Sequence, residues 1–310
     1  MSWISRFLKP KIKALFQKKS SETKESLWTT CKCKNLILKE ELSQNLNVCN
    51  KCGWHHPLNS LERFDVFFDN KEYEIIATPL PKSDPLNFVD SKKYIDRLKE
   101  ARKKTKQDDA ILIAQGKVEN IDVTVGVQDF RFMGGSFGAA SGEAFIHGVQ
   151  HAINNRTPFI FFVSSGGQRM QESGIALANM ARTVIAVNEI KKQKLPYLIV
   201  LTSNSMGGVL ASWGSLGDIM IGEHGAENLG FAGKRVIEGT IREELPDDFQ
   251  SSSSLLQLGQ LDLVVERKYL RSTIGTLLSV LLKKAETQAN TESTNVVSID
   301  KSLQKSYKAV

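Results

Sequence analysis

Apolar runs that end in paired glycines dominate the middle of the sequence. Phe159–Val163 is an unbroken apolar run, which predicts a strand that is buried on both faces. Gly166 and Gly167 follow after two serines, and apolar residues then recur with helical spacing from Gln168 to Asn188. We predict a strand–turn–helix unit with the two glycines at its turn. The predicted apolar stripe of its helix contains Ile175, Ala178, Met180, Ala181, Val184 and Val187.

The same pattern occurs twice more. Tyr197–Gly208 repeats the strand, the polar turn and the paired glycines about 40 residues further on, and a short helix is predicted over 209–213. Val123–Gly135 is an earlier and weaker copy, followed by a helix predicted from about Ser141 to Asn154. Such repetition suggests stacked units whose turns form one binding edge. The alternative is three ordinary strand–helix turns, in which glycine serves only the backbone conformation.

A turn of this kind offers a particular chemistry. The first amides of a helix have no intrahelical acceptor, and the helix dipole adds partial positive charge there. Glycine leaves the main chain open to close approach by a ligand. The turns can therefore hold an anionic oxygen.

The remaining patterns complete an α/β chain. The segment 110–130 alternates in the manner of a hairpin that turns at Glu119-Asn120, and 94–106 is a charged helix. A short edge strand is predicted at 262–265 and a helix at 269–284. Four apolar residues are placed to pack on the main domain: Phe64, Val66, Phe67 and Phe68.

Length and charge narrow the class of protein. The chain has 310 residues and a formal net charge of +7, and its composition is that of a soluble globular protein. No apolar run is long enough to span a membrane, and the basic start lacks the apolar segment of a secretory signal. We expect a basic flexible tail over 1–26, a disordered tail over 286–310 and a location in the cytoplasm.

All four cysteines lie between residues 31 and 52. They form two close pairs, Cys31-x-Cys33 and Cys49-x-x-Cys52, separated by fifteen residues. Two such pairs suit a tetrahedral Zn²⁺ ion, and four protein ligands would leave no position for substrate. Disulfides are the alternative, but the absence of an export signal favours a structural metal. We predict a zinc ribbon over 27–56 and a main domain over 57–285.

The motifs together resemble one known family. Trp28-Thr29, the cysteine ribbon, Asp129–Ser136, Ser165–Glu172, Met206–Gly208 and Gly230–Gly233 are similar, in the same order, to the β subunit of bacterial and plastid acetyl-CoA carboxylase carboxyltransferase. The resemblance runs from about residue 28 to about residue 284. It implies a crotonase-like fold of ββα superhelical turns that carries an N-terminal zinc ribbon.

The resemblance also implies a reaction and partners. The family transfers a carboxyl group from N-carboxybiotin to acetyl-CoA and so forms malonyl-CoA. It works as an α₂β₂ unit with an α subunit of the same fold, a biotin carboxyl carrier protein and biotin carboxylase. The resemblance places the oxyanion site at the amides of Gly166 and Gly167. It assigns support of the CoA pocket to Gly134, Gly135, Gly207 and Gly208.

Three departures from the family pattern stand out. The family's first cysteine pair is Cys-x-x-Cys, whereas this chain has Cys31-Lys-Cys33, which puts zinc affinity in question. Ser203-Asn204-Ser205 stands where the family usually has Asp-Pro-Thr, and Glu223–Asn228 replaces a slightly shorter segment. Arg131 and Arg169 are candidates for phosphate contacts, but we favour structural salt bridges for both.

Alternative functions remain open at this point. Another acyl-CoA, such as propionyl-CoA, is a second candidate substrate. A ClpP-like serine hydrolase would need Ser164, Ser165 or Ser205 beside a histidine, and no Gly-x-Ser-x-Gly motif surrounds them. Nucleic-acid binding by the ribbon would fit the positive charge, but basic and aromatic residues do not interleave.

Overall fold

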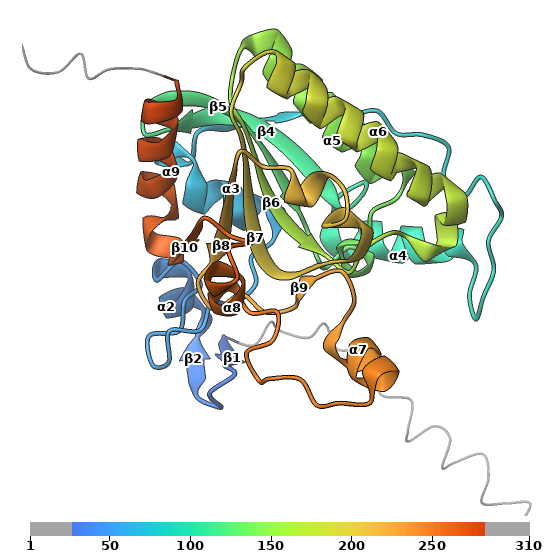
Figure 1. Cartoon of the computed structure of the whole chain (residues 1–310), viewed down its shortest axis with the longest axis horizontal. Helices are drawn as coiled ribbons and strands as arrows, with labels where there is room; N and C mark the ends of the chain where they lie inside the picture. The colour runs from blue at the N-terminus through green and yellow to red at the C-terminus, as the bar shows by residue number, and fades with distance from the viewer. Residues whose placement is uncertain (1–26, 283–310) are drawn as a thin grey trace, which may run out of the picture.

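The computed structural model describes residues 27–282. The predicted tails, 1–26 and 286–310, lie outside these residues. Among residues 27–282, no helix is long and apolar enough to cross a membrane. The described chain contains a small two-stranded sheet near its start and one larger sheet flanked by helices (Figure 1).

The larger sheet has eight strands. Seven follow the order β10-β8-β7-β6-β5-β4-β3, and β9 pairs with the far end of β7. Strands β5 to β8 and β10 are parallel, whereas β3, β4 and β5 are antiparallel, which confirms the predicted hairpin and the edge strand. The strands are β3 (Tyr73–Ile76), β4 (Ile111–Val118), β5 (Ile121–Gln128), β6 (Phe159–Ser165), β7 (Tyr197–Met206), β8 (Ile219–Glu223), β9 (Leu229–Gly230) and β10 (Leu263–Val265).

Helices cover both faces of this sheet. Helices α5 (Ala139–Asn155) and α6 (Ser173–Lys192) lie side by side on one face, and α9 (Arg267–Leu281) lies on the other with α3 (Ser60–Phe67) (Figure 1). Strand β6 contributes alternate residues to two separate cores: Phe159 and Phe161 pack toward α5, whereas Ile160 and Phe162 pack toward α3 and α9. The prediction of a strand buried on both faces is therefore confirmed.

The predicted stripe of α6 was largely wrong. Val187 is buried, but Val184 is exposed, and small or polar residues fill most of the buried face. The cause is the close approach of α5, because a Cβ atom on Gly142 would lie 2.6 Å from Cγ of Asn179. A small residue on one helix thus admits a polar residue of the other, which an apolar-stripe rule does not find. The buried residues of α6 are Ala176, Asn179, Thr183, Ala186, Val187 and Ile190.

The predicted helix over 209–213 is also wrong. The chain after β7 forms two separate 3₁₀ turns, Gly207–Val209 and Trp213–Ser215. The Ser212 hydroxyl donates to the carbonyl oxygens of Gly208 and Val209. Such side-chain bonds compete with continued helix. Further 3₁₀ turns occur at Asp69–Lys71, Met133–Gly135 and Met170–Glu172.

Smaller elements surround the sheet. The ribbon consists of β1 (Trp28–Thr30), β2 (Leu36–Leu38) and α2 (Lys39–Gln44). Helix α4 (Tyr94–Thr105) confirms the charged helix predicted at 94–106. Two short helices, α7 (Lys234–Ile241) and α8 (Ser252–Gln257), connect β9 to β10 (Figure 1). The packing predicted for Phe64, Phe67 and Phe68 is confirmed, because all three are buried against the sheet, whereas Val66 is only partly buried.

Candidate active site

The three glycine turns lie together at the carboxyl ends of adjacent strands. The Gly134–Gly135 turn follows β5, the Gly166–Gly167 turn follows β6, and the Gly207–Gly208 turn follows β7. The Gly166 amide donates to the carbonyl oxygen of Gly134 at 2.9 Å, which joins the first two turns. A Cβ atom on Gly167 would lie 3.4 Å from Cα of Gly207, which places the third turn beside the second. Parallel pairing of β5, β6 and β7 explains this convergence.

Four of the six glycines have a positive φ at which a side chain is strained: Gly134, Gly135, Gly167 and Gly207. Gly135 has a φ of +62°, and a Cβ atom there would lie 2.0 Å from the carbonyl oxygen of Ser164. Gly167 has a φ of +112°, a backbone conformation that L side chains rarely adopt. At Gly166, in contrast, a Cβ atom would meet only the Gly134 carbonyl oxygen, at 3.4 Å. The glycines therefore differ, and Gly166 is open enough to accept a side chain.

The expected free amides are engaged in this structure. Besides the bond from Gly166 to Gly134, the Gly167 amide donates to the Ser165 hydroxyl at 3.0 Å. The Ser165 hydroxyl in turn donates to the carbonyl oxygen of Gly135 at 2.7 Å, and Gln128 donates to the same oxygen. An anionic ligand must displace an acceptor to reach either amide. The prediction that both lie free at the turn needs this correction.

Gln128 belongs to this arrangement and was missed in the sequence. Its side chain is buried at the end of β5, and its Nε2 lies 2.7 Å from the Gly135 oxygen. The signal was weak, because a single glutamine directly after an apolar run looks like the polar end of a strand.

Arg169 is fully buried behind the second turn. Its guanidinium makes a two-pronged contact with Asp109 at 2.7 Å and 2.7 Å, and it also donates to the Ser136 carbonyl oxygen at 2.7 Å. Burial favours the protonated acid, but Arg169 holds the pKa of Asp109 below its ordinary value. Arg131 pairs with Asp129 at 2.6 Å. The salt-bridge roles favoured for both arginines are confirmed.

A groove runs along the outer side of the first two turns. It has a volume of about 520 Å³ and is lined by Gly134, Gly166, Gln168 and Met170. Helix α4 forms the opposite wall with Arg97 and Lys104 among other residues. The turns are therefore accessible to a ligand from this side.

A second cavity lies between the ribbon and the strand ends. Its volume is about 490 Å³, which is within the usual range of small-molecule sites. The ribbon side contributes Lys32 and Trp54, and the strands contribute Gln128, Ser164 and Thr202. The cavity thus reaches the carboxyl ends of β5, β6 and β7 from the ribbon.

A buried ion-pair cluster joins the ribbon to the main domain at this cavity. Glu223 accepts from Arg63 at 3.0 Å and 3.0 Å and from Arg267 at 2.7 Å. Burial opposes its ionisation, but Arg63 and Arg267 hold the pKa of Glu223 well below its ordinary value. Arg267 also donates to the carbonyl oxygens of Leu46 and Asn47 in the ribbon. The ribbon therefore contacts the domain through a partly buried, charged side chain that is itself held by the buried carboxylate of Glu223.

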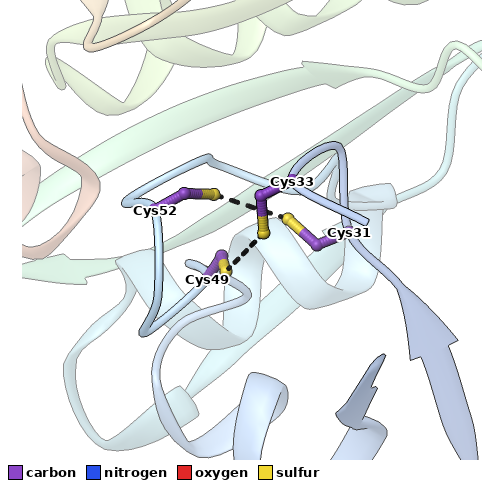
Figure 2. A group of neighbouring side chains, drawn as sticks. All are labelled: Cys31, Cys33, Cys49 and Cys52. Carbon is purple, nitrogen blue, oxygen red and sulfur yellow. Dashed lines mark hydrogen bonds between the residues drawn. The ribbon is translucent and has the colours of Figure 1, made fainter. Parts of the chain in front are cut away.

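The four cysteine sulfur atoms converge in the ribbon. Cys31 and Cys52 are separated by 3.6 Å and Cys33 and Cys49 by 4.0 Å, and all four sulfurs lie within 4.8 Å of one another (Figure 2). A tetrahedral ion with metal–sulfur bonds of about 2.3 Å requires separations of about 3.8 Å. Hydrogen bonds from the main chain and side chain of Asn35 lower the pKa of the Cys33 thiol to about 6. The cluster therefore fits a metal ion despite the short first pair.

The serine residues do not form a hydrolase site. The Ser165 hydroxyl donates to Gly135, the Ser205 hydroxyl donates to Val163 and Thr202, and the Ser164 hydroxyl donates to Ser203. All of these acceptors are main-chain carbonyls and not imidazoles. A serine nucleophile requires an adjacent base, so this geometry does not support hydrolysis.

Comparison with known proteins identifies the family. The profile of the "Carboxyl transferase domain" family matches residues 87–255, which include all three glycine turns. A protein from Pelagibacter ubique named acetyl-coenzyme A carboxylase carboxyl transferase subunit beta is 49% identical over 288 residues, which cover 92% of this chain and 93% of that protein. A protein of the same name from Brucella abortus is 45% identical, with 92% and 94% covered.

The chain belongs to the family of acetyl-coenzyme A carboxylase carboxyl transferase β subunits. The resemblance predicted from the motifs is therefore confirmed. Family members are carboxyltransferases, and this chain is an enzyme subunit of that class.

Solved structures show the same fold. Transcarboxylase 12S superposes with a TM-score of 0.60 at 21% identity, which covers 78% of this chain and 44% of that chain. A chain of the Pseudomonas malonate decarboxylase MdcD-MdcE hetero-dimer gives a TM-score of 0.54 at 18% identity, with 73% and 86% covered. The predicted crotonase-like α/β fold is confirmed by these neighbours.

Proposed function

We propose that this chain transfers a carboxyl group from N-carboxybiotin, carried by a biotin carboxyl carrier protein, to acetyl-CoA and so forms malonyl-CoA. The observation that carries the proposal is the 49% identity, over 92% of the chain, to a relative named for that enzyme and subunit. The joined glycine turns supply the kind of main-chain site that the reaction needs. We also propose a location in the cytoplasm, which suits a reaction that uses acetyl-CoA for fatty acid synthesis.

The chemistry requires stabilisation of an enolate. A proton leaves the acetyl carbon next to the thioester, and negative charge moves onto the thioester oxygen. The bond between the carboxyl carbon and the biotin nitrogen of carboxybiotin breaks. The biotin nitrogen then accepts the proton from the acetyl group. The enolate carbon forms the new carbon–carbon bond. Main-chain amides that the fold holds in place can stabilise such an oxygen once it has displaced their present acceptors.

We assign the oxyanion site to the Gly166–Gly167 turn. The Gly167 amide is the donor that is easiest to release, because its acceptor is a neutral serine hydroxyl. An anionic oxygen is a stronger acceptor than a hydroxyl and can take its place. The Gly166 amide contacts the Gly134 carbonyl and lines the open groove. Gly134, Gly135, Gly207 and Gly208 support the pocket around this turn.

The metal of the ribbon is proposed to be one structural zinc ion per chain. Cys31, Cys33, Cys49 and Cys52 supply four sulfur ligands, which is the preferred set for zinc and leaves no open position. Bound zinc would hold the two cysteine turns together and supply folding energy that so small a ribbon lacks. Because Arg267 donates to two carbonyl oxygens of the ribbon, a ribbon ordered by zinc would also fix the position of Arg267 in the cavity wall.

The proposed partners follow from the same reaction. An α subunit of the same fold would complete an α₂β₂ unit, and biotin carboxylase would recharge the biotin on its carrier protein. The similarity to one half of the longer transcarboxylase 12S chain supports a second carboxyltransferase-like chain as partner. Met170, which lines the groove, is a large apolar side chain that is 66% exposed, and a partner surface would cover it.

The deciding experiment mixes this chain with its α partner, carboxybiotin and acetyl-CoA. Malonyl-CoA is the expected product, formed only when both chains are present. Propionyl-CoA in place of acetyl-CoA measures the preference for acyl length in the same assay. Absence of any carboxylated CoA product from the complete mixture would overturn the proposed function.

A further inference from the structure

Arg169 lies where it can control the alignment of two glycine turns. It follows the Gly166–Gly167 turn in sequence, yet its guanidinium reaches across to the segment that follows Gly134–Gly135. There Nη2 donates to the Ser136 carbonyl oxygen at 2.7 Å and Nε donates to the Ser136 hydroxyl at 3.1 Å. One side chain therefore ties the end of one turn to the end of the other.

Other side chains hold the Arg169 guanidinium in place besides its contacts to Ser136. Asp109, two residues before β4, accepts from Nη1 and Nη2 at 2.7 Å each, and Ser141 of α5 donates to the same carboxylate. Glu172 and the Tyr94 hydroxyl of α4 lie 3.3 Å and 3.2 Å from Nη1. These groups come from four separate elements, and the guanidinium side chain is 0% exposed. Its position is fixed by the fold and not by solvent.

We infer that Arg169 is a positioning residue for the proposed reaction, acting through the alignment of the turns and without contact to substrate. The inference rests on the proposed function. The distance that it controls is the one from the Gly166 amide to the Gly134 carbonyl, 2.9 Å in this structure. A shift of about 1 Å in a catalytic group lowers rates by up to roughly a hundredfold.

The geometry makes Arg169→Lys the informative substitution. Lysine keeps the positive charge, but it has a single ammonium group and cannot make the fork to Asp109 while also donating to Ser136. Asp109→Asn breaks the same contact from the other side with nearly the same side-chain shape. Both variants should lower kcat by about ten- to hundredfold and leave the KM for acetyl-CoA within about twofold.

The two changes should also be non-additive. Arg169 and Asp109 act through a single shared contact, so kcat in the double variant should fall no further than in the more impaired single variant. Arg182→Lys is the matched control, because Arg182 bonds to Glu143 and Asn179 at an exposed site between α5 and α6. Its kcat should equal that of the wild type. Rates are measured on the assembled complex and expressed per folded chain, with folding checked by circular dichroism.

A measurement that needs no activity separates this inference from the proposed function. Hydrogen exchange at the Gly166 amide should become at least about tenfold faster in Arg169→Lys, because its acceptor is no longer held in line. If neither Arg169→Lys nor Asp109→Asn folds, Tyr94→Phe removes only a hydroxyl from the cluster and should speed the same exchange. Unchanged exchange overturns the inference whether or not the complex makes malonyl-CoA. A raised KM with unchanged kcat also overturns it, since Arg169 would then act on substrate binding.

Discussion

The amide of Gly166 donates to the carbonyl oxygen of Gly134 across 2.9 Å, and so joins turns that follow neighbouring parallel strands. This bond sets the shape of the proposed oxyanion site. The glycines at the site have different tasks, because some are required by the backbone and others leave room for a ligand. Substitutions at single glycines can therefore separate folding from catalysis.

Gly135→Ala should destabilise the protein. The added Cβ atom would lie 2.0 Å from the Ser164 carbonyl oxygen, and the φ of +62° is unfavourable for alanine. We expect a loss of about 2–4 kcal/mol in the free energy of unfolding, measured by urea denaturation. Gly239→Ala is the control, since nothing lies within 4 Å of its added atom and the residue is in helix α7. An unchanged midpoint for Gly135→Ala would contradict the observed packing.

Ser165→Ala should keep substantial carboxyltransferase turnover. The hydroxyl donates to the Gly135 carbonyl and accepts from the Gly167 amide, and neither bond makes it a nucleophile. We expect kcat within about tenfold of the wild type and a loss of stability of about 1–2 kcal/mol. Ser205→Ala, whose hydroxyl also donates to carbonyls, serves as the parallel variant. Abolished turnover in a folded Ser165→Ala protein would revive the serine-nucleophile alternative.

Glu223→Gln should destabilise the protein strongly at neutral pH. The change leaves Arg63 and Arg267 buried without their carboxylate, which costs about 3–5 kcal/mol. Glu227→Gln is the control, because the Lys32–Glu227 pair is more than half exposed and contributes less than about 1 kcal/mol. Equal unfolding midpoints for the two variants would contradict the role of the cluster.

The same cluster predicts a pH dependence. The folded pKa of Glu223 lies well below its ordinary value of 4.5, so its contribution is complete above pH 4.5 and is lost as the pH falls further. The difference in unfolding free energy between wild type and Glu223→Gln should therefore shrink as the pH is lowered below 4.5. A difference that stays constant down to the acid unfolding of the protein would refute the depressed pKa.

Metal analysis should find one zinc ion per chain. Cys49→Ser removes one of four converging sulfurs and should abolish stoichiometric binding, because the remaining three ligands hold the ion far less tightly. Asn50→Ser, next to it in the same turn, should bind zinc normally. Preparations that contain no metal, or in which Cys49→Ser retains a full equivalent, would count against the zinc proposal.

The strands and turns could be predicted from the sequence because each is determined by residues that are neighbours in the chain. An apolar run such as Phe159–Val163 followed by Gly166–Gly167 has few other structural solutions, and the parallel order then brings the turns together. The four cysteines were readable for the same reason, since their spacing alone suits one ion.

The buried ion pairs that support the site could not be predicted from the sequence because they join residues that are far apart in the chain. Arg63 and Glu223 are 160 positions apart, and Asp109 and Arg169 are 60 apart, so no local pattern connects them. Asn179 shows a different limit, because its burial depends on the small size of Gly142 in the neighbouring helix. The engaged state of the Gly167 amide likewise depends on how the Ser165 side chain is oriented.

The most direct test of the oxyanion assignment is the rate of malonyl-CoA formation by Gly166→Val in complex with the α partner. The position tolerates a Cβ atom, which would meet only the Gly134 carbonyl oxygen at 3.4 Å, so the variant should fold with a nearly unchanged Tm. The side chain would block the approach of the thioester oxygen, and kcat should fall by about a hundredfold or more. A folded Gly166→Val complex that turns over at the wild-type rate would contradict the account.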